Sequence, residues 1–169
     1  MASGWFGGPI PADSDNETDP AYTFIQDYLG GQSVSPGTGT ITAIECYGHA
    51  ISAAGIFAIF TKAGTTYTGT GNSGALAIAV GLNQFAAPTH FTAFSVAAGQ
   101  YAGFFNMTLE RLYDAAADMW YYEGNGTTSA HVYATAAGRV HMFRFYVTET
   151  PAGLSIPVVE MNYRRRRKS

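Results

Sequence analysis

The spacing of short β-rich runs constrains this chain more than any other feature. From Thr38 onward, segments rich in β-branched and aromatic residues alternate with Gly, Asn and Thr, at intervals of roughly 8–15 residues. The pattern predicts about ten strands, over residues 40–47, 55–62, 65–70, 75–82, 91–96, 101–108, 119–123, 130–135, 139–148 and 155–163. Such a rhythm is typical of a β-sandwich or barrel.

One stretch between these strands does not alternate. Leu109, Leu112, Tyr113 and Ala116 recur at helical spacing within residues 109–120. A helical turn and a strand–turn–strand both remain open for this stretch. No unit repeats at a fixed period of about 20–50 residues, which disfavours solenoids and propellers.

Residues 1–37 differ from the rest because Gly and Pro interrupt them too often for regular structure. They are nevertheless rich in aromatic residues, unlike a disordered linker. We therefore expect an extended arm that docks either along its own domain or onto a neighbour, with a short helix over residues 20–29 as an option. The side chains expected to make the assembly contacts are Trp5, Phe6, Tyr22 and Phe24.

Charge is scarce and unevenly distributed. Only 12% of the 169 residues are charged, against 47% hydrophobic, and weakly charged surfaces tend to associate. Five of the twelve acids lie in the first 27 residues, and five of the nine bases form the C-terminal run Arg164, Arg165, Arg166, Arg167 and Lys168. Nucleic acid, a membrane surface and the acidic arm of another subunit are all suitable partners for this run. We favour pairing between subunits.

The residues give little support for catalysis. His49, His90, His131 and His141 each stand alone in their segments, and no nucleophile elbow or zinc motif is present. His141 shares strand parity with Arg139, which predicts an outward-facing side chain. We therefore expect no enzymatic activity, no catalytic residues, no cofactor and no metal site.

Acids at alternate positions from Asp13 to Asp19 resemble the start of a calcium loop. Thr18 and Phe24 stand where an EF-hand needs Gly and Glu, which excludes that motif. A solvated arm is the default for these acids, and a looser calcium or subunit-bridging site remains the alternative. The single cysteine, Cys46, excludes an internal disulfide and is expected to be a small buried hydrophobe.

No run reaches the roughly 18 apolar residues of a membrane-spanning helix. Residues 1–11 lack the regions of a secretory signal. We expect a soluble product without a cleavable export signal.

The richest aromatic cluster is Trp120-Tyr121-Tyr122, followed by Glu123-Gly124-Asn125-Gly126. Aromatic faces beside polar groups can stack on sugar rings, so Trp120, Tyr121 and Asn125 form a candidate ligand platform. Core packing is the competing interpretation, because strand alternation sends Trp120 and Tyr121 to opposite faces.

Residues 94–105 read Phe-Ser-Val-Ala-Ala-Gly-Gln-Tyr-Ala-Gly-Phe-Phe. This segment resembles a hairpin of the jelly-roll sandwiches found in phage and virus structural proteins and in bacterial surface domains, with Gly99 in the turn and Tyr101 returning to the inner face. The resemblance covers about a dozen residues. It implies a jelly roll used for assembly or attachment.

Together these patterns predict an antiparallel jelly-roll-like β-sandwich over residues 38–163, with an arm at 1–37 and a basic tail at 164–169. The function that we expect is that of a non-enzymatic structural or decoration subunit of a virus-like or phage-like particle. Such a subunit would be located in the virion and would work as a homo-oligomer beside other particle subunits. The alternative is a carbohydrate- or receptor-binding module.

Overall fold

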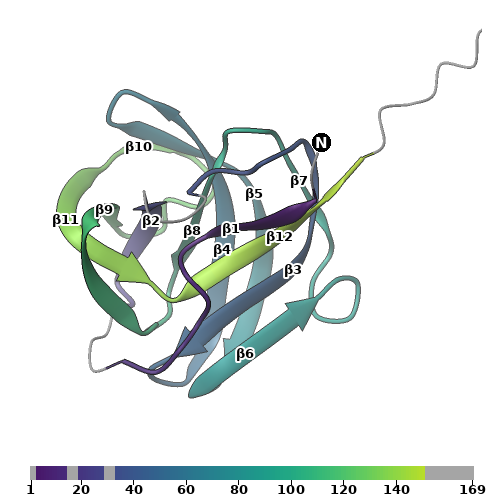
Figure 1. The fold of residues 1–169 in the computed structure, drawn as a ribbon, viewed down its shortest axis with the longest axis horizontal. Coiled ribbons are helices and arrows are strands. Elements are labelled where there is room, and N and C mark those ends of the chain that lie inside the picture. Colours follow the sequence, from purple (N-terminus) through teal and green to yellow (C-terminus); the bar gives the residue numbers. More distant parts are fainter. Residues whose placement is uncertain (1–2, 15–18, 29–32, 151–169) are drawn as a thin grey trace, which may run out of the picture.

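The computed structural model describes residues 3–14, 19–28 and 33–150. Within these ranges the chain contains no helix, and its strands form two antiparallel sheets (Figure 1). The all-β prediction is confirmed, and the two sheets are consistent with a β-sandwich. The predicted strand 155–163 and the basic tail 164–169 lie outside the described residues.

One sheet has five strands. Its order is β1-β12-β3-β6, and β7 also pairs with β3. The bounds are β1 Gly4–Gly7, β12 Phe143–Glu149, β3 Gly39–Gly48, β6 Gly81–Ala86 and β7 Phe94–Val96.

The other sheet has seven strands, in the order β10-β5-β4-β8-β2-β9-β11. The bounds are β10 Ala130–Val132, β5 Thr66–Ile78, β4 Ser52–Ala63, β8 Tyr101–Phe105, β2 Tyr22–Tyr28, β9 Arg111–Glu123 and β11 Ala134–His141.

Phenylalanine dominates the core between the sheets. Phe57 on β4 and Phe104 on β8 face Phe143 on β12, with ring centroids 6.1 and 5.1 Å from that ring, and all three side chains are buried. Burial of each such side chain stabilises the fold by roughly 1.5–3 kcal/mol. Cys46 lies in the same core, as predicted, and burial raises the pKa of its thiol.

The N-terminal segment is part of the sandwich. Of the two docking alternatives, the described residues follow the one along their own domain, since β1 pairs with β12 and β2 lies between β8 and β9. Phe6 and Phe24 are only 2% and 5% exposed, so their assignment as assembly contacts is wrong. The optional helix at 20–29 is also wrong, because residues 22–28 bond to strands on both sides. Residue 38 therefore does not separate an arm from the sandwich.

Two further expectations are corrected by strand pairing. The 109–120 stretch is neither a helix nor a strand–turn–strand: β9 is a single strand that pairs with β2 and β11. Gly99 does form a turn, with φ at +82°, but the strands on either side of it do not form a hairpin. β7 belongs to the five-stranded sheet and β8 to the seven-stranded one, so the turn crosses between sheets.

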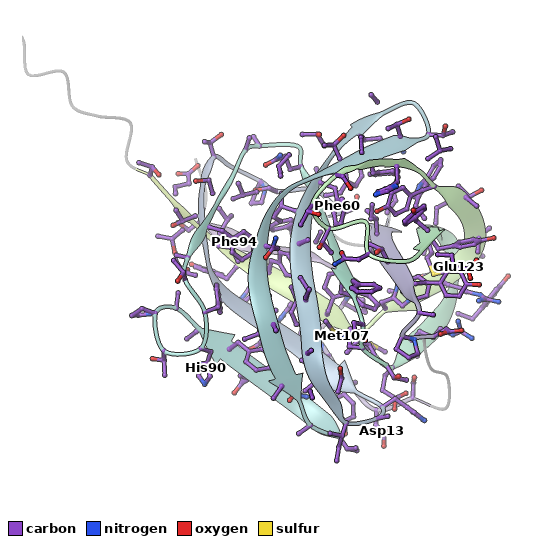
Figure 2. The ribbon with its side chains drawn as sticks, turned by 180° about the vertical axis from the view of Figure 1, so that it is seen from behind. Asp13, Phe60, His90, Phe94, Met107 and Glu123 are labelled. Carbon is purple, nitrogen blue, oxygen red and sulfur yellow. The ribbon has the colours of Figure 1, made fainter. Side chains whose placement is uncertain are left out.

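The seven-stranded sheet also buries side chains on the face turned away from the other sheet. There, Ile25, Ala58, Phe60, Tyr67 and Tyr133 form a second cluster, hereafter the outer cluster; Phe60 is labelled in Figure 2. Against it pack Tyr101, Trp120 and Tyr122.

The path of the chain closes the sheet over this outer cluster. β10 pairs with β5, β11 pairs with β9, and Tyr133 alone joins β10 to β11. The segment before β10 passes against Gly69, where an added Cβ would lie 2.1 Å from the carbonyl oxygen of Thr127. The sheet is therefore curled, with its two edges connected by one residue.

A substitution in the core tests whether β2 is a buried strand or a detachable arm. Phe24→Ala is expected to lower the free energy of unfolding by about 3–5 kcal/mol, measured by denaturant titration, because it leaves a cavity between the sheets. Ile10→Ala, at a side chain that is 70% exposed, should change it by less than about 0.5 kcal/mol. If Phe24→Ala unfolded with the same free energy as the wild type but assembled differently, residues 22–28 would be an arm after all.

Candidate ligand-binding groove

The aromatic platform expected from the sequence is divided between two faces of the sheet. Trp120 packs against the outer cluster, whereas Tyr121 packs against the core between the sheets. Asn125 belongs to neither site, since its side-chain oxygen accepts hydrogen bonds from the N–H and hydroxyl of Thr127 at 3.0 and 2.6 Å. The three residues therefore do not form one platform.

Trp120 makes an intramolecular cation–π contact. The Lys62 ammonium lies 4.5 Å from the Trp120 ring centroid and 5.4 Å from that of Tyr67, and its nitrogen is 3.8 Å from Asp27 Oδ2. A side chain of the protein thus occupies the position over the Trp120 ring that a ligand cation would take.

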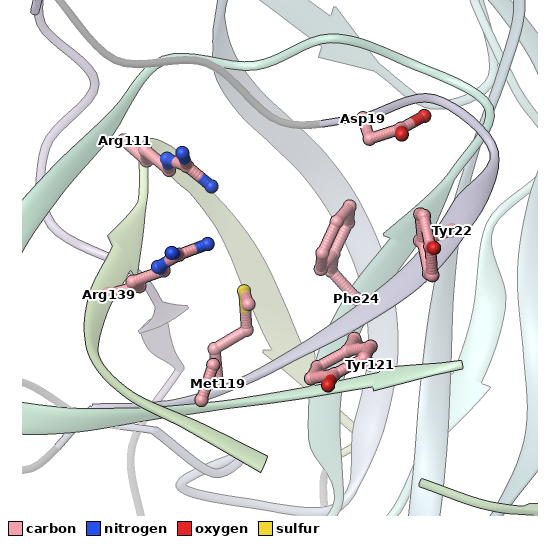
Figure 3. Close-up of a pocket in the computed structure, with 8 residues that line it drawn as sticks. Asp19, Tyr22, Phe24, Arg111, Met119, Tyr121 and Arg139 are labelled. Atoms are coloured by element: carbon pink, nitrogen blue, oxygen red, sulfur yellow. The ribbon is translucent and has the colours of Figure 1, made fainter. Parts of the chain in front are cut away.

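A hollow of about 250 Å³ opens on the other face of β2, β9 and β11 (Figure 3). In that view Arg111 and Arg139 lie on one side of the hollow, and Tyr22, Phe24 and Tyr121 on the other. The lining consists of Asp19, Tyr22, Phe24, Arg111, Met119, Tyr121, Ala136 and Arg139.

A second hollow, of about 190 Å³, adjoins the first. It is lined by Arg111, Leu112, Tyr113 and Arg139, so the two hollows share both guanidinium groups. We call the pair the arginine groove. Tyrosines line both parts, namely Tyr22 and Tyr121 in the first and the 79% exposed Tyr113 in the second.

A large irregularity between β9 and β11 shapes the groove. Ala137 pairs with Asp118, but Arg139, two residues on, pairs with Tyr113, so only Gly138 stands opposite residues 114–117. Gly138 has φ at +77°, and an added Cβ would come within 2.4 Å of the Tyr113 ring. Glycine is therefore required here by both its backbone conformation and the close approach of the ring.

The fully buried Gln26 bonds to backbone groups on both sides of this irregularity. Its Nε2 donates to the carbonyl oxygens of Asp118 and Arg139, both at 3.2 Å. Its Oε1 accepts the backbone N–H of His141 at 2.8 Å and lies 3.1 Å from His141 Nδ1. Because Oε1 can only accept, Nδ1 is the protonated nitrogen of a neutral imidazole. One amide thus holds both strands beneath the groove.

His141 is fully buried, so the expectation of an outward side chain is wrong. It shares its face with Arg139 as predicted, but Phe24 and Phe104 cover it, with ring centroids 5.0 and 5.1 Å away. Burial, and then the charges of Arg111 and Arg139, lower the pKa of His141 to about 3. The field of the two guanidinium groups therefore extends into the core.

Sequence reasoning missed most of the groove. Tyr121 was named for ligand contact and Tyr22 for assembly contact, whereas Arg111 and Arg139 were not proposed as site residues. The available signal was Gln26, an amide that directly follows the apolar Phe24 and Ile25. Such an amide needs hydrogen-bond partners when it is buried.

Neither a metal-binding cluster nor a membrane-spanning helix occurs among the described residues. They contain no group of three or more His, Cys, Asp or Glu side chains that could hold a metal ion. Nor do they form a helix long and apolar enough to cross a membrane.

The arginine run 164–168 lies outside the described residues, so its anion contacts stay a prediction. No protein-family model, no curated protein and no solved structure matches the chain.

The buried imidazole predicts a pH dependence of stability. The unfolded state, with a His pKa near 6.5, binds more protons than the folded state between about pH 6.5 and 3, so stability falls as pH falls through this window. For His141→Gln we expect a smaller slope of unfolding free energy against pH between about pH 4 and 6, by up to ~1.4 kcal/mol per pH unit. Ile10→Ala, at a 70% exposed side chain without a titrating group, is the control and should keep the wild-type slope. Identical slopes for all three proteins would contradict the assignment.

Proposed function

We propose that this chain is a non-enzymatic jelly-roll subunit of a virus-like or phage-like particle, working as a homo-oligomer. The observation that carries the proposal is the pairing of eight strands. β1 pairs with β12, β2 with β8, β3 with β6, and β4 with β5. Counted along the chain without β7, β9, β10 and β11, the first of these eight strands pairs with the eighth, the second with the seventh, the third with the sixth and the fourth with the fifth. This is the pairing of one long hairpin that is wrapped into two sheets, which is how a jelly roll is built.

The remaining strands are additions to this pattern. β9, β10 and β11 come between the seventh and eighth strands, and they extend the larger sheet beyond β2 and β5. β7 precedes the seventh strand and pairs with β3. Jelly rolls occur in viral capsid domains and in lectins, so the fold alone does not choose between assembly and ligand binding.

The outer face of the five-stranded sheet supports assembly. Arg144 stacks on the Trp5 ring at 4.3 Å and forms an ion pair with Glu45 at 2.6 Å, while Tyr146 contacts Trp5 edge-on at 5.2 Å. Because the two charges neutralise each other, two copies of this face do not repel. Such a neutral, aromatic surface suits contact with a second copy of the chain.

Apolar side chains extend this face at one end. Leu82, on the edge strand β6, is 55% exposed, and Ile51 and Val80 in the adjoining turns are 81% and 65% exposed. β6 pairs only with β3 among the described strands. An edge strand flanked by exposed apolar residues favours association.

A carbohydrate- or receptor-binding module is the second candidate. The arginine groove favours it, since two cations and tyrosine rings line a concave surface. The two functions use different faces, and a particle subunit that also binds a receptor is consistent with both.

Light scattering across protein concentration and salt tests the assembly proposal. We expect the wild type to exceed the 18.0 kDa chain mass and Leu82→Glu to shift towards it, because a charge is introduced into the contact. Val132→Glu is the matched control, at a 68% exposed residue on the larger sheet, and should leave the mass unchanged. Loss of the oligomer on raising the salt would instead implicate the charged termini. A wild-type monomer at every concentration would contradict the proposal.

A further inference from the structure

We infer that two copies of this chain pair through the edge strand β6, antiparallel and about a two-fold axis, so that their five-stranded sheets become one continuous sheet. The inference rests on the assembly proposal and names the contact between subunits. The axis passes between the two copies of Asn83, and Leu82 of each copy lies opposite Gln84 of the partner subunit.

The strand β6 lacks the features by which proteins protect the edges of their sheets. Its six residues, Gly81–Ala86, include no charged residue and no proline, and its register with β3 has no shift. The edge strands β1, β7 and β10 have only four, three and three residues, and β11 carries Arg139 and an irregularity. Among the edges of the described residues, β6 is therefore the least protected against pairing with another strand (Figure 1).

The hydrogen bonds at the end of β6 indicate which of its backbone groups point outwards. The Ala87 N–H donates to the carbonyl oxygen of Thr42 on β3 at 3.0 Å. Both backbone groups of Ala86 instead bond to His90, the N–H to Nδ1 at 3.1 Å and the carbonyl oxygen to the His90 N–H at 3.0 Å. Successive residues of a strand turn these groups to alternate sides. Every second residue of β6, counted back from Ala86, therefore points its N–H and carbonyl group away from β3.

The next residues with this outward direction are Gln84 and Leu82. Among the described strands β6 pairs only with β3, and His90, labelled in Figure 2, closes the edge at Ala86. Opposite residues of an antiparallel pair can exchange both of their hydrogen bonds. Two-fold pairing of Leu82 with Gln84 uses both open residues and no other. The short edge therefore fits a second copy of itself better than a longer foreign strand.

The side chains of the edge suit the same arrangement. Leu82 and Gln84 are both exposed on the outer face, so pairing places an apolar side chain beside an uncharged amide. The register also brings the exposed Val80 of each copy beside the end of β6 in the partner subunit. Glu45, which accepts a hydrogen bond from the Gln84 amide, forms an ion pair with Arg144. No unpaired charge on this part of the face therefore opposes a second copy.

The contact is small, which sets the kind of dimer to expect. Stable interfaces bury about 1,200–2,000 Å² in total, more than a short strand pair supplies. We therefore expect a dimer whose population rises with protein concentration. Because β6 carries no charge, this dimer should persist when the salt is raised, unlike one held by charged termini.

Proline at position 84 tests the main-chain pairing. Gln84→Pro removes an N–H that does not bond to β3, so the fold should persist while each copy loses a donor to the other. Gln84→Ala is the matched control, because it loses the same side-chain bond to Glu45 but keeps the N–H. In analytical ultracentrifugation we expect the dimer dissociation constant to rise about tenfold or more for Gln84→Pro, and by less than about threefold for Gln84→Ala. Equal constants for the two variants would overturn the inference.

Cysteine cross-linking tests the register without a proline. Residues of a hydrogen-bonded antiparallel pair have Cα atoms about 5.5 Å apart, which suits a disulfide. We expect Leu82→Cys mixed with Gln84→Cys to give a disulfide-linked dimer under mild oxidation. Either variant alone should not cross-link, because identical positions lie roughly 8 Å apart. The native Cys46 is buried and does not interfere. Absence of the dimer from the mixture, or equal cross-linking of either variant alone, would overturn the inference.

The outcomes separate the edge contact from the assembly proposal. A wild-type oligomer whose mass Gln84→Pro leaves unchanged would overturn edge pairing and keep assembly through another face. A wild-type monomer at every concentration would overturn both. Hydrogen exchange distinguishes one further case, in which the Leu82 and Gln84 amides are equally protected at all concentrations. The edge would then be covered within one chain, and the inference would be overturned.

Discussion

Burial of the seven-stranded sheet on both faces is the constraint on which the rest of this structure depends. Phe24 and Ile25, adjacent on β2, enter different clusters: one between the sheets and one on the outer side. A strand buried on both faces and bonded on both edges cannot leave the domain without exposing two apolar surfaces. This is why a segment with the composition of an arm behaves as a central strand, and why Tyr133 can join the two edges of the sheet over an aromatic interior.

The groove is a consequence of the same arrangement. β9 and β11 continue the sheet beyond β2. The irregularity at Gly138 interrupts the regular pairing between these two strands. Gln26 bonds to backbone groups of both β9 and β11, so these polar groups have a partner where the pairing is irregular. Strand divergence thereby creates a concave surface without a mobile loop, which is the kind of support that a binding site needs.

Charge, although scarce, is distributed with a clear division of roles. Lys62 and Arg144 pair with Asp27 and Glu45, and both lie over aromatic rings, so they contribute to packed surfaces. Arg111 and Arg139 both line one groove. The proposed assembly face is therefore neutral and the proposed ligand site cationic. The two faces belong to different sheets, so assembly and ligand binding do not compete for the same residues.

The sequence by itself determined the fold class and most strands after residue 38, because the β-branched and aromatic residues that favour β3, β4 and β12 are a local property of each segment. It also indicated that Trp120 and Tyr121 face opposite ways. Only the tertiary structure decided which of those faces is covered and which is open, since that depends on the path of the other sheet and of the segment before β10. It alone assigned β1 and β2 to the sheets, and it alone brought Tyr22, Arg111 and Arg139 together. Pairing between residues about a hundred positions apart is chosen by total burial and hydrogen bonding of the folded chain, and no local pattern records it.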